Sequence, residues 1–157
     1  MKRFAVFITA MIFATQAYAG MIAPRDGWAV HDTTMGYTEL VDSMTTAIKA
    51  EGMFIVTQAG PTAAAAKSGI VIPKNRVFGI YRNDYAVRTL ATSTAAMIEA
   101  PIRLYVTENA DGTATLSYKT PGAVFAPYLD EGGAELSAIA VELDAIFATI
   151  AARAVAK

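Results

Sequence analysis

The 157-residue chain contains no cysteine, and it has one histidine, His31. The missing thiols exclude disulfide bonds, thiol catalysis, cysteine-ligated zinc and iron–sulfur sites, and covalent c-type haem attachment. One histidine is too few for a zinc hydrolase site, which usually uses two or three. The fold must therefore be held by packing alone, or by packing together with a partner chain.

Several further features are absent from the sequence. After residue 19 no apolar run approaches the roughly 18 residues of a membrane span, so no transmembrane helix is expected. The 13 basic and 14 acidic residues leave a net charge of −1, which provides no electrostatic footprint for nucleic acid. Neither a phosphate-binding glycine loop nor a serine-hydrolase elbow is present. An enzyme built on Tyr and Arg is a weaker option, because the sequence names no nucleophile for it.

The first 19 residues have the three parts of a secretory signal peptide. Lys2 and Arg3 form a positive start, an apolar run follows over residues 4–14, and small residues stand at Ala17 and Ala19. The run is too short to cross a bilayer. We predict cleavage after Ala19 and a mature protein that is periplasmic or secreted.

After a lead-in over residues 20–35, the segment 36–157 is predicted to form one α+β domain. Helical periodicity at residues 37–51 changes to strand periodicity at residues 53–58, and Asp111-Gly112 between two strand-like runs indicates a hairpin. The expected fold has two layers, a mainly antiparallel sheet with helices on one face and a long C-terminal helix. The expected strands are 27–32, 53–58, 76–82, 102–108 and 113–119, and the expected helices are 37–51, 62–68, 84–92 and 133–155.

Several motifs occur in an order that resembles a known family. A helix ends in IKAEGMFIV (residues 48–56), a strand runs into Asn83, and APIRLYVTENADG (residues 100–112) begins with proline before a strand. Pro121 and the long last helix complete the pattern. The chain resembles the uncharacterised bacterial family called domain of unknown function 302, although the family usually has proline where Asp84 stands here. The resemblance implies a compact α+β domain that tends to form homodimers, and no established enzymatic activity.

The most suggestive polar set is Arg82 and Asn83 together with Arg103 and Tyr105. A strand-to-helix junction presents backbone N–H groups and the positive end of the helix dipole. Two arginines beside it would hold a carboxylate or phosphate of a small ligand. Alternatively, the arginines form structural ion pairs with neighbouring carboxylates, the candidates being Asp84, Glu99 and Glu108.

His31 and Met35 suggest a metal-handling alternative. Imidazole and thioether ligands suit copper, and an extracytoplasmic protein meets copper. Haem ligation by His31 from two subunits is a related option. The plainer interpretation is that His31 is a surface or loop residue and that the methionines fill the core.

The C-terminal helix carries an apolar stripe that is wider than packing on one sheet requires. We therefore predict a dimer interface at Leu143, Ile146 and Ile150. Aromatic residues before this helix, Tyr118, Phe125 and Tyr128, either line an apolar pocket or cover the core. The leading hypothesis is a non-enzymatic homodimer that binds a small anionic or apolar ligand or a partner protein.

Overall fold

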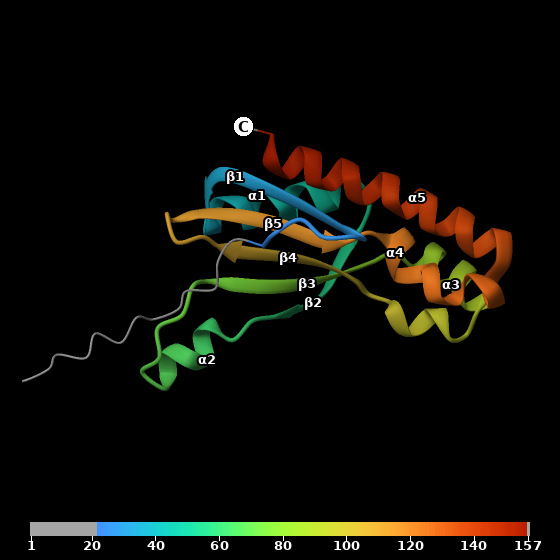
Figure 1. Cartoon of the computed structure of the whole chain (residues 1–157), viewed down its shortest axis with the longest axis horizontal. Coiled ribbons are helices and arrows are strands. Elements are labelled where there is room, and N and C mark those ends of the chain that lie inside the picture. Colours follow the sequence, from blue (N-terminus) through green and yellow to red (C-terminus); the bar gives the residue numbers. More distant parts are fainter. Residues whose placement is uncertain (1–21, 157) are drawn as a thin grey trace, which may run out of the picture.

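The computed structural model describes residues 22–156, and the predicted signal peptide lies outside them (Figure 1). Five strands in this part of the chain form one sheet in the order β1-β5-β4-β3-β2, and all neighbouring strands are antiparallel. The predicted α+β class with an antiparallel sheet is confirmed. The strands are β1 (Trp28–Gly36), β2 (Phe54–Ala59), β3 (Asn75–Tyr81), β4 (Ile102–Glu108) and β5 (Thr113–Lys119).

The long helix α5 (Leu129–Val155) lies along the sheet and contacts α1, α3 and α4 (Figure 1). Gly133, with a φ of 59°, interrupts α5, and the regular part therefore begins where the sequence predicts it. No helix among residues 22–156 is long and apolar enough to cross a membrane. The other helices are α1 (Tyr37–Ala50), α2 (Thr62–Lys67), α3 (Asn83–Thr92) and α4 (Pro121–Phe125), with 3-10 turns at Ala96–Glu99 and Ala126–Tyr128.

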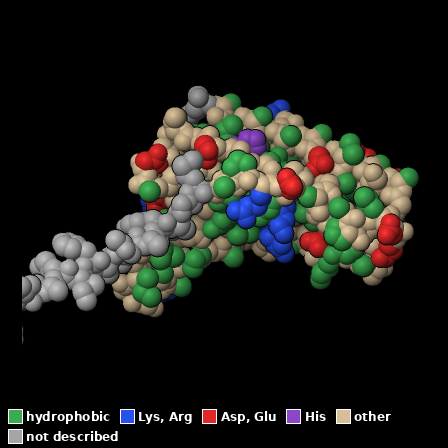
Figure 2. Space-filling view, viewed as in Figure 1, with side chains coloured by type: hydrophobic (Ala, Val, Ile, Leu, Met, Phe, Trp, Pro, Cys, Tyr) green, Lys and Arg blue, Asp and Glu red, His purple; other side chains and the backbone are tan. Residues whose placement is uncertain are grey.

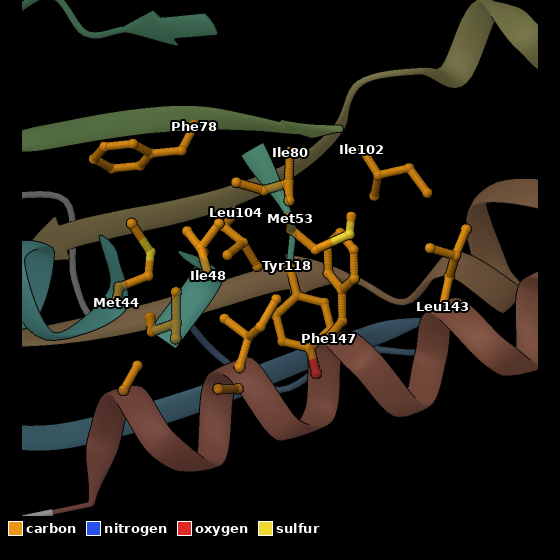
Figure 3. Packing of buried hydrophobic residues seen from close by; sticks show 14 of the residues in the cluster. Met44, Ile48, Met53, Phe78, Ile80, Ile102, Leu104, Tyr118, Leu143 and Phe147 are labelled. Atoms are coloured by element: carbon orange, nitrogen blue, oxygen red, sulfur yellow. The ribbon is translucent and has the colours of Figure 1, made fainter. Parts of the chain in front are cut away.

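The core fills the space between the sheet and the helices α1, α3, α4 and α5 (Figure 3). Alternate strand residues such as Phe78 and Leu104 face the helices, where the Tyr118 and Phe147 rings lie 5.6 Å apart. Leu143 is 4% exposed and Ile150 is fully buried in this core. This corrects the predicted dimer interface, because both residues pack inside the folded monomer. Ile146, the third predicted interface residue, is partly buried against the same core.

Local details also differ from the sequence expectations. The first strand continues to Gly36, which places much of the expected lead-in within the sheet. The helix expected at residues 84–92 begins one residue earlier, at Asn83, and Arg82 occupies the N-cap position. The segment after β5, where no helix is expected, contains α4, in which the Thr120 hydroxyl accepts a hydrogen bond from the Ala123 N–H at 3.3 Å. Pro121 suits the first turn because proline has no N–H to satisfy there.

Candidate functional site

The face of the sheet opposite the core carries a cross-strand row of Val77, Tyr105, Ser117 and Val30. Successive side chains of a strand point to opposite faces, so these residues alternate with the core residues Phe78, Leu104 and Leu116. The same alternation places Arg103 and Lys119 on this second face. Two basic residues of the central strands therefore project away from the core.

The register of the β4–β5 hairpin makes Arg103 and Lys119 cross-strand neighbours. Leu104 pairs with Tyr118 at the end of the β4–β5 ladder. Continuing this antiparallel register by one residue on each strand sets Arg103 opposite Lys119. Both side chains are exposed, and neither has an ion pair or hydrogen bond with any residue in the described chain. Like charges directly opposite each other destabilise a sheet. The two side chains thus carry positive charge with which no carboxylate of the described residues forms an ion pair.

This pair borders a pocket of about 330 Å³. The pocket lies where β4 begins and β5 ends, beside α4, and Figure 2 shows Lys and Arg side chains gathered near this end of the strands. Its volume is at the lower end of the range for small-molecule sites. Apart from the two cations, its main lining residues are Trp28, Val77, Glu99, Tyr105, Val124 and Pro127.

Trp28 forms a wall of the pocket, and the chain around it is tied to the start of α4. The Thr120 N–H donates a hydrogen bond to the Gly27 carbonyl at 2.9 Å. Gly27 has a φ of 74°, and a Cβ there would lie 2.8 Å from the Cβ of Ala123, so this close approach needs glycine. The Arg25 guanidinium stands 5.2 Å from the centre of the Trp28 ring. The indole is therefore held at the pocket with a third cation beside it.

Glu99 contributes the pocket's carboxylate. The Tyr128 hydroxyl donates a hydrogen bond to Glu99 Oε1 at 2.8 Å, and this bond raises the pKa of Tyr128. The hydroxyl therefore keeps its proton and remains a donor. Although Glu99 lines the same pocket as Arg103, it forms no ion pair with either basic residue there.

The structure divides the predicted ligand site. Arg103 and Tyr105 line the pocket, whereas Arg82 and Asn83 do not. Arg82 forms an ion pair with Asp84, with Nε 2.8 Å from Oδ1, and this hydrogen bond lowers the pKa of Asp84. Arg82 thus follows the alternative interpretation of a structural ion pair, which does not apply to Arg103.

The proposed metal ligands His31 and Met35 both lie on β1. His31 stacks on Tyr118 with ring centroids 6.1 Å apart, and Met35 is buried in the core at 4% exposure. The pairing of β1 with β5 is irregular between these two residues, with a register shift between Asp32 and Gly36. Between residues 22 and 156 no three His, Cys, Asp or Glu side chains are grouped as metal ligands would be.

His31 gives the fold a predicted pH dependence. Burial lowers the pKa of His31 below 6.5, and Asp32 opposes that shift in part. As the pH falls, His31 therefore becomes protonated in the unfolded chain before it does so in the folded protein. The stabilising contribution of the neutral His31 is complete above about pH 7 and declines at lower pH. Urea unfolding at pH 7.5 and at pH 5.5 gives the fall in the free energy of unfolding between the two pH values. We expect this fall to be smaller for His31→Gln than for the wild type. Equal losses would contradict this role.

Sequence reasoning does not single out Trp28, Glu99 or Lys119 as site residues. Lys119 could have been predicted from the sequence, because the Asp111-Gly112 turn sets the hairpin register. Continued to the strand ends, this register places Lys119 opposite Arg103. Glu99 and Trp28 come from separate segments that only the tertiary fold brings to the pocket. Of the aromatic residues Tyr118, Phe125 and Tyr128, Phe125 is 2% exposed in the core, and Tyr118 belongs to the core and also lines the pocket.

Comparisons with known proteins agree with the fold. Residues 29–152 match the family profile described as "Domain of unknown function DUF302". The crystal structure of an uncharacterized conserved DUF302 protein from Bacillus stearothermophilus is similar, with a TM-score of 0.72 and 18% sequence identity. The similarity covers 82% of this chain and 98% of that one, and at such low identity it shows the fold alone. No functionally curated protein matches the chain.

Proposed function

Because the chain belongs to the family described as Domain of unknown function DUF302, whose description names no activity, we propose a function from its own pocket. The protein binds a small organic anion with an apolar or aromatic body and carries out no chemistry on it. The observation that carries this proposal is the exposed, unpaired pair of Arg103 and Lys119 at the edge of an apolar-walled pocket.

The physical reason is that an anion between Arg103 and Lys119 would relieve their mutual repulsion. Guanidinium groups bind carboxylates through paired, charge-assisted hydrogen bonds. Trp28 and Tyr105 offer aromatic faces to the rest of the ligand, and Val124 adds apolar surface. A purely inorganic anion would use the charges and leave these walls without a partner.

Calorimetric titration with 3-phenylpropanoate tests the proposal. This probe has one carboxylate and one phenyl ring, and phenethylamine is its cationic counterpart of similar size. We expect saturable binding of one 3-phenylpropanoate per chain and no detectable binding of phenethylamine. Absence of 3-phenylpropanoate binding, or equal binding of both compounds, would overturn the proposed anion site.

We also propose that the protein acts outside the cytoplasm as a homodimer. The signal-like residues 1–19 support the location. The edge strand β2 supports a partner, because it contains no charged residue, and Phe54 and Val56 on it are 64% and 50% exposed. Exposed edge strands usually carry charged residues or proline, which prevent pairing with another chain. The strand β2 has neither.

Native mass spectrometry of protein recovered from the periplasm or medium tests both expectations. We expect a chain that begins at Gly20 and a native mass equal to two such chains. An unprocessed chain retained in the cytoplasm would contradict the location. A native mass of one chain at micromolar concentration would contradict the homodimer.

A further inference from the structure

The pocket holds charges of both signs that do not neutralise one another. Arg103 and Lys119 provide the positive charge, and Glu99 provides the negative charge. Among the described residues, no side-chain nitrogen of Arg103 or Lys119 lies within 4.0 Å of a Glu99 carboxylate oxygen. Opposite charges therefore line a pocket of about 330 Å³ without forming an ion pair with one another.

The position of Glu99 is fixed by its own hydrogen bond. Tyr128 donates to Oε1, which leaves Oε2 without a hydrogen-bond partner among residues 22–156. Glu99 also lies in the 3-10 turn Ala96–Glu99, immediately before the Ala100–Pro101 segment that leads into β4. The free oxygen is therefore presented by a structured segment next to the strand that carries Arg103.

An anion alone does not complement this arrangement. A carboxylate bound at Arg103 and Lys119 would leave the Glu99 carboxylate partly desolvated without a partner, which is unfavourable. A ligand that also carries an ammonium group satisfies both ends, since an ammonium group donates up to three hydrogen bonds. The apolar walls between the charges then receive the ligand's hydrocarbon or aromatic part.

We propose, on the basis of the proposed anion site, that the natural ligand is a zwitterion, namely an amino acid or short peptide with an apolar side chain. Its carboxylate binds Arg103 and Lys119, and its ammonium group binds Glu99. Its side chain packs against Trp28 and Val124. Glu99 then determines specificity, because it distinguishes a zwitterion from a simple organic acid.

Matched probes test this inference by calorimetry on the mature protein. L-phenylalanine differs from 3-phenylpropanoate only by its ammonium group, and L-alanyl-L-phenylalanine carries the two charges farther apart. We expect at least one of the two zwitterions to bind tenfold or more tightly than 3-phenylpropanoate. If neither binds more tightly than 3-phenylpropanoate, the zwitterion inference is overturned while the anion site stands. If none of the three compounds binds, both proposals fail.

The variant Glu99→Gln separates a specificity role from a structural one. Its amide oxygen still accepts the Tyr128 hydrogen bond, but its charge is gone. We expect the tenfold advantage of the zwitterion to disappear and the affinity for 3-phenylpropanoate to be unchanged or increased. Glu135→Gln, which removes a surface carboxylate paired with Arg88, is the matched control and should preserve the advantage. Equal weakening of both ligands by Glu99→Gln would contradict the inference.

Discussion

The variant Lys119→Glu is expected to bind 3-phenylpropanoate roughly 10- to 100-fold more weakly than the wild type, because a charge-assisted hydrogen bond contributes about 1.5–3 kcal/mol. The new carboxylate would also occupy Arg103, its cross-strand neighbour in the hairpin register. At the same time, an unfavourable pair of like charges becomes a favourable pair of opposite charges. We therefore expect the free energy of unfolding to rise by about 0.2–1 kcal/mol.

A weaker affinity together with a higher free energy of unfolding in Lys119→Glu would show that Lys119 serves binding rather than the fold. If Lys119 served the fold, its replacement would lower stability and leave any ligand affinity largely intact. Lys67→Glu is the matched control, because Lys67 is an exposed lysine on α2 that does not line the pocket. Calorimetry and urea unfolding of both variants give the two quantities. Unchanged affinity in Lys119→Glu would remove Lys119 from the site.

Phe147→Ala is expected to lower the free energy of unfolding by about 3–5 kcal/mol. Phe147 is fully buried and packs against Tyr118 between α5 and the sheet (Figure 3), so truncation leaves a cavity that the close-packed core cannot fill. A loss of this size is a large part of the 5–15 kcal/mol that stabilises a typical domain.

The matched control for this prediction is Val141→Ala, in the same helix. Val141 is 65% exposed, and its truncation should change the free energy of unfolding by no more than about 0.5 kcal/mol. Urea unfolding at neutral pH measures both variants. Similar losses for Phe147→Ala and Val141→Ala would contradict the packing of α5 on the sheet.

The fold was largely predictable because local signals agreed with the tertiary structure. Gly52 separates a helical period from a strand period, and the structure has α1 and β2 on its two sides. The Asp111-Gly112 turn predicts the hairpin, and the strands have the predicted bounds of 102–108 and 113–119. The helix α4 was harder to predict, because a proline and a glycine at its start are equally typical of a loop.

The site was only partly predictable, because side-chain direction depends on strand parity. Ile80 pairs with Ile102 on the core face, so Arg82, two residues beyond Ile80, continues on that side. Arg103, next to Ile102, points to the other face. Arg82 and Arg103 lie at neighbouring strand ends but therefore belong to opposite faces of the sheet.

The dimer interface predicted on the C-terminal helix was wrong because it was inferred from the width of the apolar stripe alone. The width of an apolar stripe does not reveal how many elements pack against it. The helix α5 contacts α1, α3 and α4 as well as β1, and Leu143 and Ile150 are buried in the core. A stripe that is too wide for one sheet is therefore explained by several packing partners within one chain.

The indole N–H signal of Trp28 gives the most direct test of the central claim that an organic anion binds in this pocket. Trp28 is the only tryptophan, so a ¹H–¹⁵N spectrum of the protein contains one such signal and needs no further assignment. Titration with 3-phenylpropanoate is expected to shift that signal saturably in the wild type, and to a much smaller extent in Lys119→Glu. A signal that stays fixed at saturating 3-phenylpropanoate, or that shifts equally in both proteins, would contradict a binding site between Trp28 and the Arg103–Lys119 pair.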